Sequence, residues 1–257
     1  MVIGVVGYGN MGESFARSLK GRAELLVYDT NPGRCESALK EGFGVAKDLE
    51  FLLQSSRWLL LAVKPKDAPE VLQRLRGKLK DRLLVSVVAG LSLSKMEELT
   101  GSSSLVRLMP NINALVGRAT IACAFARGVQ EREREEFVEL FSSCGSLYTI
   151  GEELFDAFTA LAGSGPAFVF KFVHALALAG LREGFSYETA KSIAVDVVLG
   201  SCELLKQKGG NPEDWLIRVA SPAGTTVEGV KVLEERGFVG TLMECVRKTS
   251  ERAKTLL

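Results

Sequence analysis

Short apolar runs and amphipathic stretches alternate along the first part of the chain. The runs are apolar at almost every position, as is typical of strands buried on both faces of a parallel sheet. The first run, Val2–Val6, is followed at βαβ spacing by an amphipathic stretch, Glu13–Lys20, before the next run begins. We therefore expect an α/β domain over residues 1–150. Its predicted strands are Val2–Val6, Glu24–Tyr28, Trp58–Val63, Leu83–Val88, Val106–Asn111 and Thr120–Phe125.

The pattern changes near residue 150, after which only helical periodicities remain. We predict a mainly helical second domain over residues 151–257. A domain this short and apolar struggles to bury its surface alone, which favours a helical core shared between subunits. Its most apolar part, Ala167–Leu181, is too short to span a bilayer and carries the single histidine, His174, expected in a core or an interface. The predicted helices are Leu154–Ala162, Ala167–Arg182, Tyr187–Lys208 with Ser186 as N-cap, one beginning at Pro212, and Thr225–Glu235.

Composition and charge narrow the class of protein. The 257 residues are 47% hydrophobic and 25% charged, and 32 basic residues against 31 acidic ones give a formal charge of +1. Neither sign forms a long block, so we expect no nucleic-acid partner and no membrane partner. The five cysteines are scattered without a Cys-x-x-Cys pair, which predicts reduced thiols and no metal site. Because the first apolar run leads into a glycine turn without a basic region or cleavage site, we expect a cytoplasmic protein.

The segment after the first predicted strand is rich in glycine and leads directly into a helix. It reads Gly7-Tyr8-Gly9-Asn10-Met11-Gly12, a Gly-x-Gly-x-x-Gly pattern. In a dinucleotide-binding fold the first glycine permits the tight turn, the second lets the backbone approach a pyrophosphate, and the third lets the helix pack closely on the strand. The segment therefore predicts a nucleotide site that includes Gly7, Gly9, Asn10, Met11 and Gly12.

The second predicted strand ends at Asp29, where a dinucleotide-binding fold places an acid on the adenosine ribose. An acid there favours NADH, whereas Asn31 and Arg34 nearby can accommodate the 2′-phosphate of NADPH. The choice between NADH and NADPH stays open on these residues. Since ligands lie beyond the carboxyl ends of parallel strands, the ends of two later runs are expected to line the same crevice. These residues are Ala62, Val63, Lys64, Pro65, Ala89 and Gly90.

A second candidate site is the turn Ser221-Pro222-Ala223-Gly224-Thr225-Thr226, which opens the predicted helix Thr225–Glu235. The free N–H groups and the positive dipole end of a helix suit a carboxylate or phosphate, and Gly224 lets a ligand come close to the backbone. The alternative for this motif alone is a threonine N-cap that only begins the helix. We expect an anion on Ser221, Gly224, Thr225 and Thr226.

Several motifs in one order give the chain a family resemblance from end to end. It resembles the pyrroline-5-carboxylate reductases. The motifs are Val6-Gly7-Tyr8-Gly9-Asn10-Met11-Gly12, Ala62-Val63-Lys64-Pro65, Val88-Ala89-Gly90, Met109-Pro110-Asn111 with Ala114-Leu115-Val116-Gly117, Ala162-Gly163-Ser164-Gly165-Pro166-Ala167 and Ser221-Pro222-Ala223-Gly224-Thr225-Thr226. One departure lies in the last motif, where Ala223 stands at a position that usually carries a second glycine.

The resemblance implies a Rossmann-type NAD(P)-binding domain followed by an all-α dimerisation domain. It also implies reduction of the cyclic imine 1-pyrroline-5-carboxylate to L-proline by NADPH or NADH, the last step of proline biosynthesis. The expected assembly is a homodimer or a higher homo-oligomer such as a decamer. We expect the substrate carboxylate on the amides of Gly224, Thr225 and Thr226, with the Thr226 hydroxyl at the ring nitrogen as the catalytic contact.

Two alternatives differ from this interpretation in chemistry. A β-hydroxyacid dehydrogenase has glycines before a helix, followed by a catalytic lysine and asparagine, but the corresponding positions here are Val169 and Val173. Lys171 is displaced by two residues, roughly 200° around the helix, which counts against alcohol chemistry. The other alternative is a homologue that binds NAD(P) without turnover, since a fold does not fix a function.

Overall fold

The computed structural model describes residues 1–254, which fall into two compact units. Of the described residues, the first unit comprises Met1–Gly163 and residues 252–254, and the second comprises Ser164–Glu251. The division comes later than the predicted one after residue 150. The reason is Phe155, which is 1% exposed and packs with Ala122 and Ala124 of the sheet, so that the segment before Ser164 belongs to the first unit.

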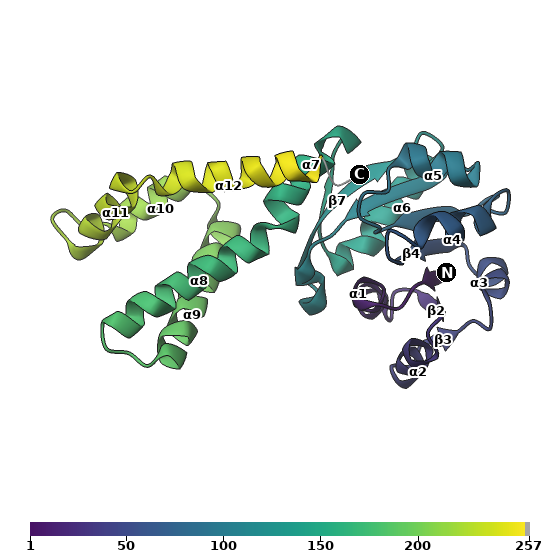
Figure 1. The fold of residues 1–257 in the computed structure, drawn as a ribbon, viewed down its shortest axis with the longest axis horizontal. Helices are drawn as coiled ribbons and strands as arrows, with labels where there is room; N and C mark the ends of the chain where they lie inside the picture. The colour runs from purple at the N-terminus through teal and green to yellow at the C-terminus, as the bar shows by residue number, and fades with distance from the viewer. Residues whose placement is uncertain (255–257) are drawn as a thin grey trace. The chain divides into compact units, whose positions relative to one another are not determined.

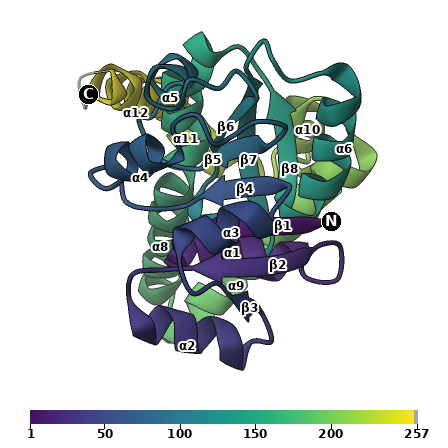
Figure 2. The same ribbon diagram turned by 90° about the vertical axis from the view of Figure 1, so that its right-hand side faces the viewer.

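The first unit is built on an eight-stranded sheet of order β3-β2-β1-β4-β5-β6-β7-β8 (Figure 1 and Figure 2). All neighbours pair in parallel except β6 and β7, which are antiparallel. This order is that of a dinucleotide-binding fold, with the crossover from β3 back to β4 on the other side of β1. The strands are β1 (Val2–Val6), β2 (Glu24–Tyr28), β3 (Gly44–Val45), β4 (Trp58–Leu61), β5 (Leu83–Ser86), β6 (Leu105–Met109), β7 (Ala119–Phe125) and β8 (Gly145–Thr149).

Alternate residues of each central strand pack on opposite faces of the sheet, as the two-residue period of a strand requires. On β4, Trp58 and Leu60 join a cluster with side chains of α1, α2 and α6, while Leu59 and Leu61 join a cluster with side chains of α3, α4 and α5. The sheet is therefore covered by helices on both faces, which explains the continuous apolar runs. These helices are α1 (Asn10–Leu19), α2 (Pro32–Lys40), α3 (Leu49–Ser55), α4 (Ala68–Leu75), α5 (Leu93–Thr100) and α6 (Glu131–Phe141).

One helical run connects the first unit to the second. It begins with α7 (Phe155–Phe158), passes through a π-helical turn (Thr159–Gly163) and continues as α8 (Gly165–Arg182). The buried Asn111 holds the π-helical turn, because its Nδ2 donates to the Ala162 carbonyl at 3.0 Å and its Oδ1 accepts from the Thr120 N–H at 3.1 Å. The π-turn carbonyl is therefore paired with a side chain of the sheet.

The second unit is helical and leaves much apolar surface uncovered within one chain. It contains α8, α9 (Tyr187–Lys208), α10 (Pro212–Val219), α11 (Thr225–Glu235) and most of α12 (Phe238–Ala253). Large apolar side chains on α8 and α9 are exposed, among them Phe170, Leu178, Val197 and Leu199. This exposure is expected of a surface that packs against another subunit.

The stretch Ala167–Leu181, predicted to be too short for a bilayer, is part of a longer helical run. The helical run Glu152–Arg182 has 31 residues and contains an 18-residue window with a mean hydropathy of 1.4, so by length and composition alone it could cross a membrane. Only 11% of its most apolar window is buried within the chain. The absence of a membrane partner stays a prediction.

Candidate functional site

The glycine-rich loop after β1 is shaped by close backbone contacts. Gly7 has φ +93°, and a Cβ on it would lie 2.8 Å from the carbonyl oxygen of Ala62. A Cβ on Gly12 would lie 2.0 Å from the carbonyl oxygen of Gly7, which is far inside any real contact. Gly9 differs, because its Cβ would meet nothing within 4 Å. Gly7 and Gly12 are thus required by packing, whereas Gly9 leaves open space at the loop.

That open space belongs to a pocket of about 520 Å³ at the carboxyl ends of the strands. Of the residues predicted to bind a cofactor, the pocket is lined by Gly7, Gly9, Asp29, Asn31, Ala62, Val63 and Lys64, together with Arg34. Asn10, Met11, Gly12, Pro65, Ala89 and Gly90 are not among its lining residues. Ala89 and Gly90 follow β5, which pairs in parallel with β4, so they still lie at the same edge of the sheet.

Sequence reasoning missed the wall of the pocket that α4 supplies. Asp67, the N-cap residue of this helix, and Glu70, Val71 and Arg74 within it all line the pocket. Lys64 and Pro65 were predicted to face the crevice at the end of a strand. Because α4 begins shortly after them, its first turn could have been predicted to face the crevice as well. Val6, Tyr28 and Thr30 complete the lining.

Asp29 fixes the loop as well as facing the pocket. Its Oδ2 accepts a hydrogen bond from the Tyr8 N–H at 2.6 Å, and its Oδ1 accepts one from the Asn31 N–H at 2.8 Å. The first bond ties the glycine loop to the end of β2, and the second shapes the turn into α2. Asn31 in turn caps α2, because its Oδ1 accepts from the Gly33 N–H at 2.9 Å.

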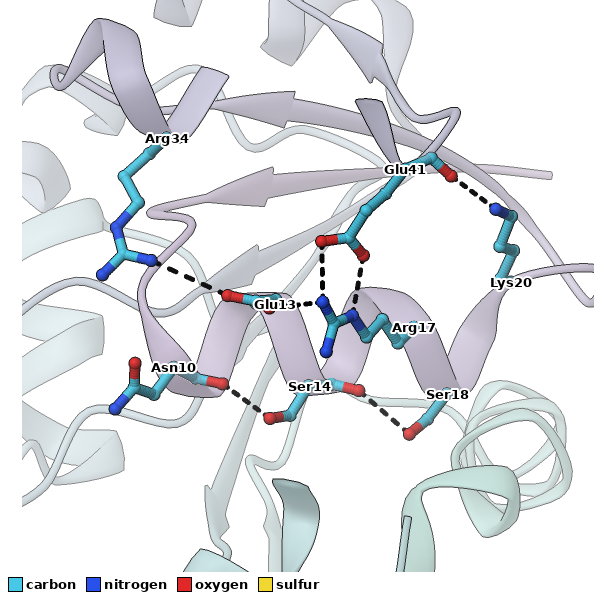
Figure 3. Close-up of polar contacts among 8 residues, drawn as sticks. All are labelled: Asn10, Glu13, Ser14, Arg17, Ser18, Lys20, Arg34 and Glu41. Atoms are coloured by element: carbon cyan, nitrogen blue, oxygen red, sulfur yellow. Dashed lines mark hydrogen bonds and ion pairs between the residues drawn. The ribbon is translucent and has the colours of Figure 1, made fainter. Parts of the chain in front are cut away.

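A chain of charged side chains runs from the edge of the pocket along α1 (Figure 3). Arg34 Nη1 lies 3.7 Å from Glu13 Oε2, and Glu13 Oε1 lies 2.7 Å from Arg17 Nη2. Arg17 also forms a bidentate pair with Glu41, at 2.7 and 2.8 Å, which lowers the pKa of the Glu41 carboxyl. Burial, with the charge of Glu41 added to it, raises the pKa of the Tyr8 hydroxyl.

The residues present fit a dinucleotide. Gly9 is the N-cap of α1 and offers no side-chain cap, and the first N–H groups of a helix have no acceptor within it. A pyrophosphate can approach there because no atom stands within 4 Å of the position that a Cβ on Gly9 would occupy. The positive end of the α1 dipole favours the negative charge. The pocket can therefore hold NADH or NADPH on Gly7, Gly9, Asp29 and Asn31.

The second predicted site lies in the second unit, at the start of α11. The helix spans Thr225–Glu235, as predicted, with Gly224 as N-cap. The Gly224 N–H donates to the Ser221 carbonyl at 3.0 Å, so the prediction that this amide holds an anion was wrong: the turn already uses it. Thr225 and Thr226 are the first helical residues, whose N–H groups have no acceptor within a helix. An anion at this turn depends on those two amides.

Two other residues singled out in the sequence, Ala223 and His174, lie in the second unit. Ala223 has φ +57°, a left-handed conformation that suits glycine, which explains why a glycine is usual at this position of the motif. His174 on α8 is exposed within the chain, and its Nδ1 lies 2.9 Å from the Tyr187 hydroxyl. A role for His174 in the core of one chain is therefore wrong, and an interface role stays a prediction.

Family models match both parts of the chain. Residues 152–256 match "Pyrroline-5-carboxylate reductase dimerisation", and residues 2–90 match "NADP oxidoreductase coenzyme F420-dependent". A pyrroline-5-carboxylate reductase of Aquifex aeolicus is 49% identical over 260 residues, which cover 100% of this chain and 97% of the relative. The likeness therefore extends through the glycine loop, the π-helical turn and the Ser221–Thr226 turn alike.

Solved structures agree with the sequence comparisons. The 1-pyrroline-5-carboxylate reductase of Streptococcus pyogenes superposes with a TM-score of 0.88 at 32% identity, covering 100% of this chain and 99% of the other. A Plasmodium falciparum pyrroline carboxylate reductase with NADP bound superposes with a TM-score of 0.84 at 28% identity, covering 99% and 97%. Both units of this chain are therefore similar to the corresponding parts of solved pyrroline carboxylate reductases.

Proposed function

The chain belongs to the pyrroline-5-carboxylate reductase family, and on this premise we propose that it reduces the C=N bond of 1-pyrroline-5-carboxylate to give L-proline. The reductant is NADH or NADPH. The observation that carries the proposal is the open space at Gly9, which we call the glycine cradle and which faces a pocket of about 520 Å³. A pyrroline-5-carboxylate reductase matches this chain over its whole length. The product places the reaction in proline biosynthesis.

The proposed reaction requires little acid or base catalysis by the protein. A protonated cyclic imine is already electrophilic, so the reaction needs orientation and placed charge. A bound reduced nicotinamide supplies the hydride. The N–H groups at the start of α1 and the open backbone at Gly9 hold the cofactor pyrophosphate, and the side chains after β2 hold its adenosine ribose.

The substrate is assigned to the turn before α11. The N–H groups of Thr225 and Thr226 hold its carboxylate at the positive end of the helix dipole, and the Ser221 hydroxyl lies within the same turn. The Thr226 hydroxyl hydrogen-bonds the ring nitrogen and orients the imine. Gly224 keeps the turn free of a steric clash, since a Cβ on it would lie 2.3 Å from Ser221 Oγ.

We further propose a cytoplasmic homo-oligomer whose basic unit is a dimer, with larger assemblies such as a decamer built from it. Support comes from the match of residues 152–256 to a dimerisation model and from the exposed apolar side chains of α8 and α9. Size-exclusion chromatography with light scattering at micromolar concentration tests this proposal. A monomer at that concentration would contradict it.

The role of Thr226 is tested with Thr226→Ala and the matched control Thr226→Ser, which keeps the hydroxyl. Loss of a hydrogen bond to a charged group costs about 1.5–3 kcal/mol, so the alanine variant is expected to lose about one to two decades in kcat/KM for 1-pyrroline-5-carboxylate. The serine variant is expected to retain most of the activity. Cofactor affinity, measured by calorimetry, should stay unchanged in both. Full activity of Thr226→Ala would refute the assigned role.

A further inference from the structure

We propose that the choice between NADPH and NADH is made by the ion pair of Glu13 and Arg34, and that Asp29 organises the loop without choosing. The inference rests on the proposed cofactor pocket, and it deepens that proposal by naming the residues that select the nucleotide. The ligand chemistry in question is the phosphate monoester on the 2′ position of an adenosine ribose, which NADPH carries and NADH lacks.

The carboxylate of Asp29 is committed to the backbone on both of its oxygens. It accepts from the Tyr8 N–H at 2.6 Å and from the Asn31 N–H at 2.8 Å, so it joins the glycine loop to the turn before α2. These two bonds are needed for the shape of the pocket whichever nucleotide is bound. Loss of the carboxylate should therefore weaken NADH and NADPH alike, and should leave their ratio nearly unchanged.

Arg34 stands where a 2′-phosphate would be recognised. It lies in the first turn of α2 and lines the pocket with Asp29 and Asn31. In dinucleotide-binding folds an arginine near the end of the second strand accommodates this phosphate. The side chain of Arg34 is 42% exposed, and its 3.7 Å separation from Glu13 is longer than a hydrogen bond. The guanidinium is thus oriented by charge, yet its N–H donors remain available for a bidentate contact with a phosphate.

Glu13 is anchored from the other side and acts on Arg34 through its charge (Figure 3). Its Oε1 lies 2.7 Å from Arg17, which is itself fixed by the bidentate pair with Glu41. The carboxylate therefore stays beside Arg34, which lines the pocket, and there it competes with a 2′-phosphate for Arg34 and repels the phosphate. Glu13 lowers NADPH affinity, and Arg34 raises it.

The two residues consequently give opposite predictions. Arg34→Ala should weaken NADPH about tenfold, because it removes a charge-assisted contact at a partly exposed site, and should change NADH less than about twofold. Glu13→Gln, which keeps the shape and removes the charge, should strengthen NADPH by roughly two- to fivefold with little effect on NADH. Lys40→Ala is the matched control, since Lys40 is an exposed cation of the same helix outside the pocket.

The test is isothermal titration calorimetry of the full-length protein with NADPH, NADH, adenosine 2′,5′-bisphosphate and adenosine 5′-monophosphate. The bisphosphate should follow NADPH through the variant series, and the monophosphate should follow NADH. Asp29→Asn should weaken both dinucleotides by similar factors. Dissociation constants are measured without turnover. The specificity proposal can therefore fail while the protein is an active reductase, and it can hold while the protein shows no reductase activity.

Three results would overturn the inference. In the first, Arg34→Ala weakens both dinucleotides equally, which would make the residue a general binding or structural one. In the second, Asp29→Asn shifts the ratio toward NADPH by tenfold or more, which would make Asp29 the selecting residue. In the third, Lys40→Ala reproduces the effect of Arg34→Ala, which would show that NADPH affinity depends on the net charge of the protein and not on contact with Arg34.

Discussion

Gly9 and Gly12 lie three residues apart, at the N-cap and in the first turn of α1, yet the same substitution should damage different properties of the protein. An alanine Cβ at Gly12 would lie 2.0 Å from the carbonyl oxygen of Gly7, a backbone atom, and no side-chain rotation can separate the two. An alanine Cβ at Gly9 would meet no protein atom within 4 Å, and the φ of −79° at Gly9 suits any residue. Gly12→Ala should therefore affect folding, and Gly9→Ala should affect binding.

The magnitudes follow from these contacts. Overpacking against backbone costs about 3 kcal/mol, and at about 2–4 °C per kcal/mol for a chain of this size Gly12→Ala should lower Tm by roughly 6–12 °C. Alanine is a poorer N-cap than glycine, but the cost is under about 1 kcal/mol, so Gly9→Ala should lower Tm by less than about 4 °C. The methyl group of Gly9→Ala stands between the backbone and the pyrophosphate. Loss of one charge-assisted hydrogen bond should weaken the cofactor about 10- to 100-fold.

Thermal unfolding followed by circular dichroism and cofactor binding followed by calorimetry separate the two effects. Gly9→Ala is expected to unfold near the wild-type temperature and to bind NADH and NADPH weakly. Wild-type affinity in Gly9→Ala would refute the reasoning about the cradle. A Tm of Gly12→Ala within about 2 °C of wild type would refute the reasoning about the backbone contact.

Four further outcomes test other parts of the structure. Asn111→Ala should lose about 1–3 kcal/mol of stability in urea unfolding, because it removes both the donor to the Ala162 carbonyl of the π-helical turn and the acceptor for the Thr120 N–H of β7. Asn111→Asp should lose at least as much, because it buries a carboxylate against the Ala162 carbonyl. Cys123 and Cys144, whose pKa burial raises to about 12, should resist an aromatic disulfide reagent at pH 8 until the protein unfolds. Glu41→Gln should cost under about 1 kcal/mol at pH 7. Because the pKa of Glu41 in the folded state is lowered from 4.5, that difference is fully present above pH 4.5 and should be lost in Tm scans as the pH falls from 4.5 through the lowered pKa. Ala223→Gly should raise or preserve Tm, since it relieves a left-handed alanine at φ +57°.

The elements that could be predicted from the sequence are those whose local signals agree with their packing. Helix α9 spans Tyr187–Lys208 with Ser186 as its N-cap, as predicted, because Ser186 Oγ accepts from the Thr189 N–H and Gly209 ends the helix. Strands β1 and β2 also have the predicted bounds, since glycine or charged residues end their apolar runs. In these segments one local pattern permits one structure.

Other features depend on partners that are distant in sequence. Strand β8, Gly145–Thr149, is largely exposed and was missed because it lacks an apolar run, and its parallel pairing with β7 is a tertiary property. The antiparallel direction of β7 is not encoded in its own residues either. At the candidate sites, the α4 wall of the pocket and the use of the Gly224 amide within its own turn became visible only in three dimensions.

Hydride transfer to the cyclic imine can be measured in a single assay. Purified protein is mixed with 1-pyrroline-5-carboxylate and with NADH or NADPH in separate reactions, and loss of the reduced nicotinamide is compared with the amount of L-proline formed. We expect turnover with at least one cofactor, and one L-proline formed for each nicotinamide oxidised. Binding of the cofactor by calorimetry without oxidation of either cofactor would contradict it and would indicate a homologue that binds NAD(P) without turnover.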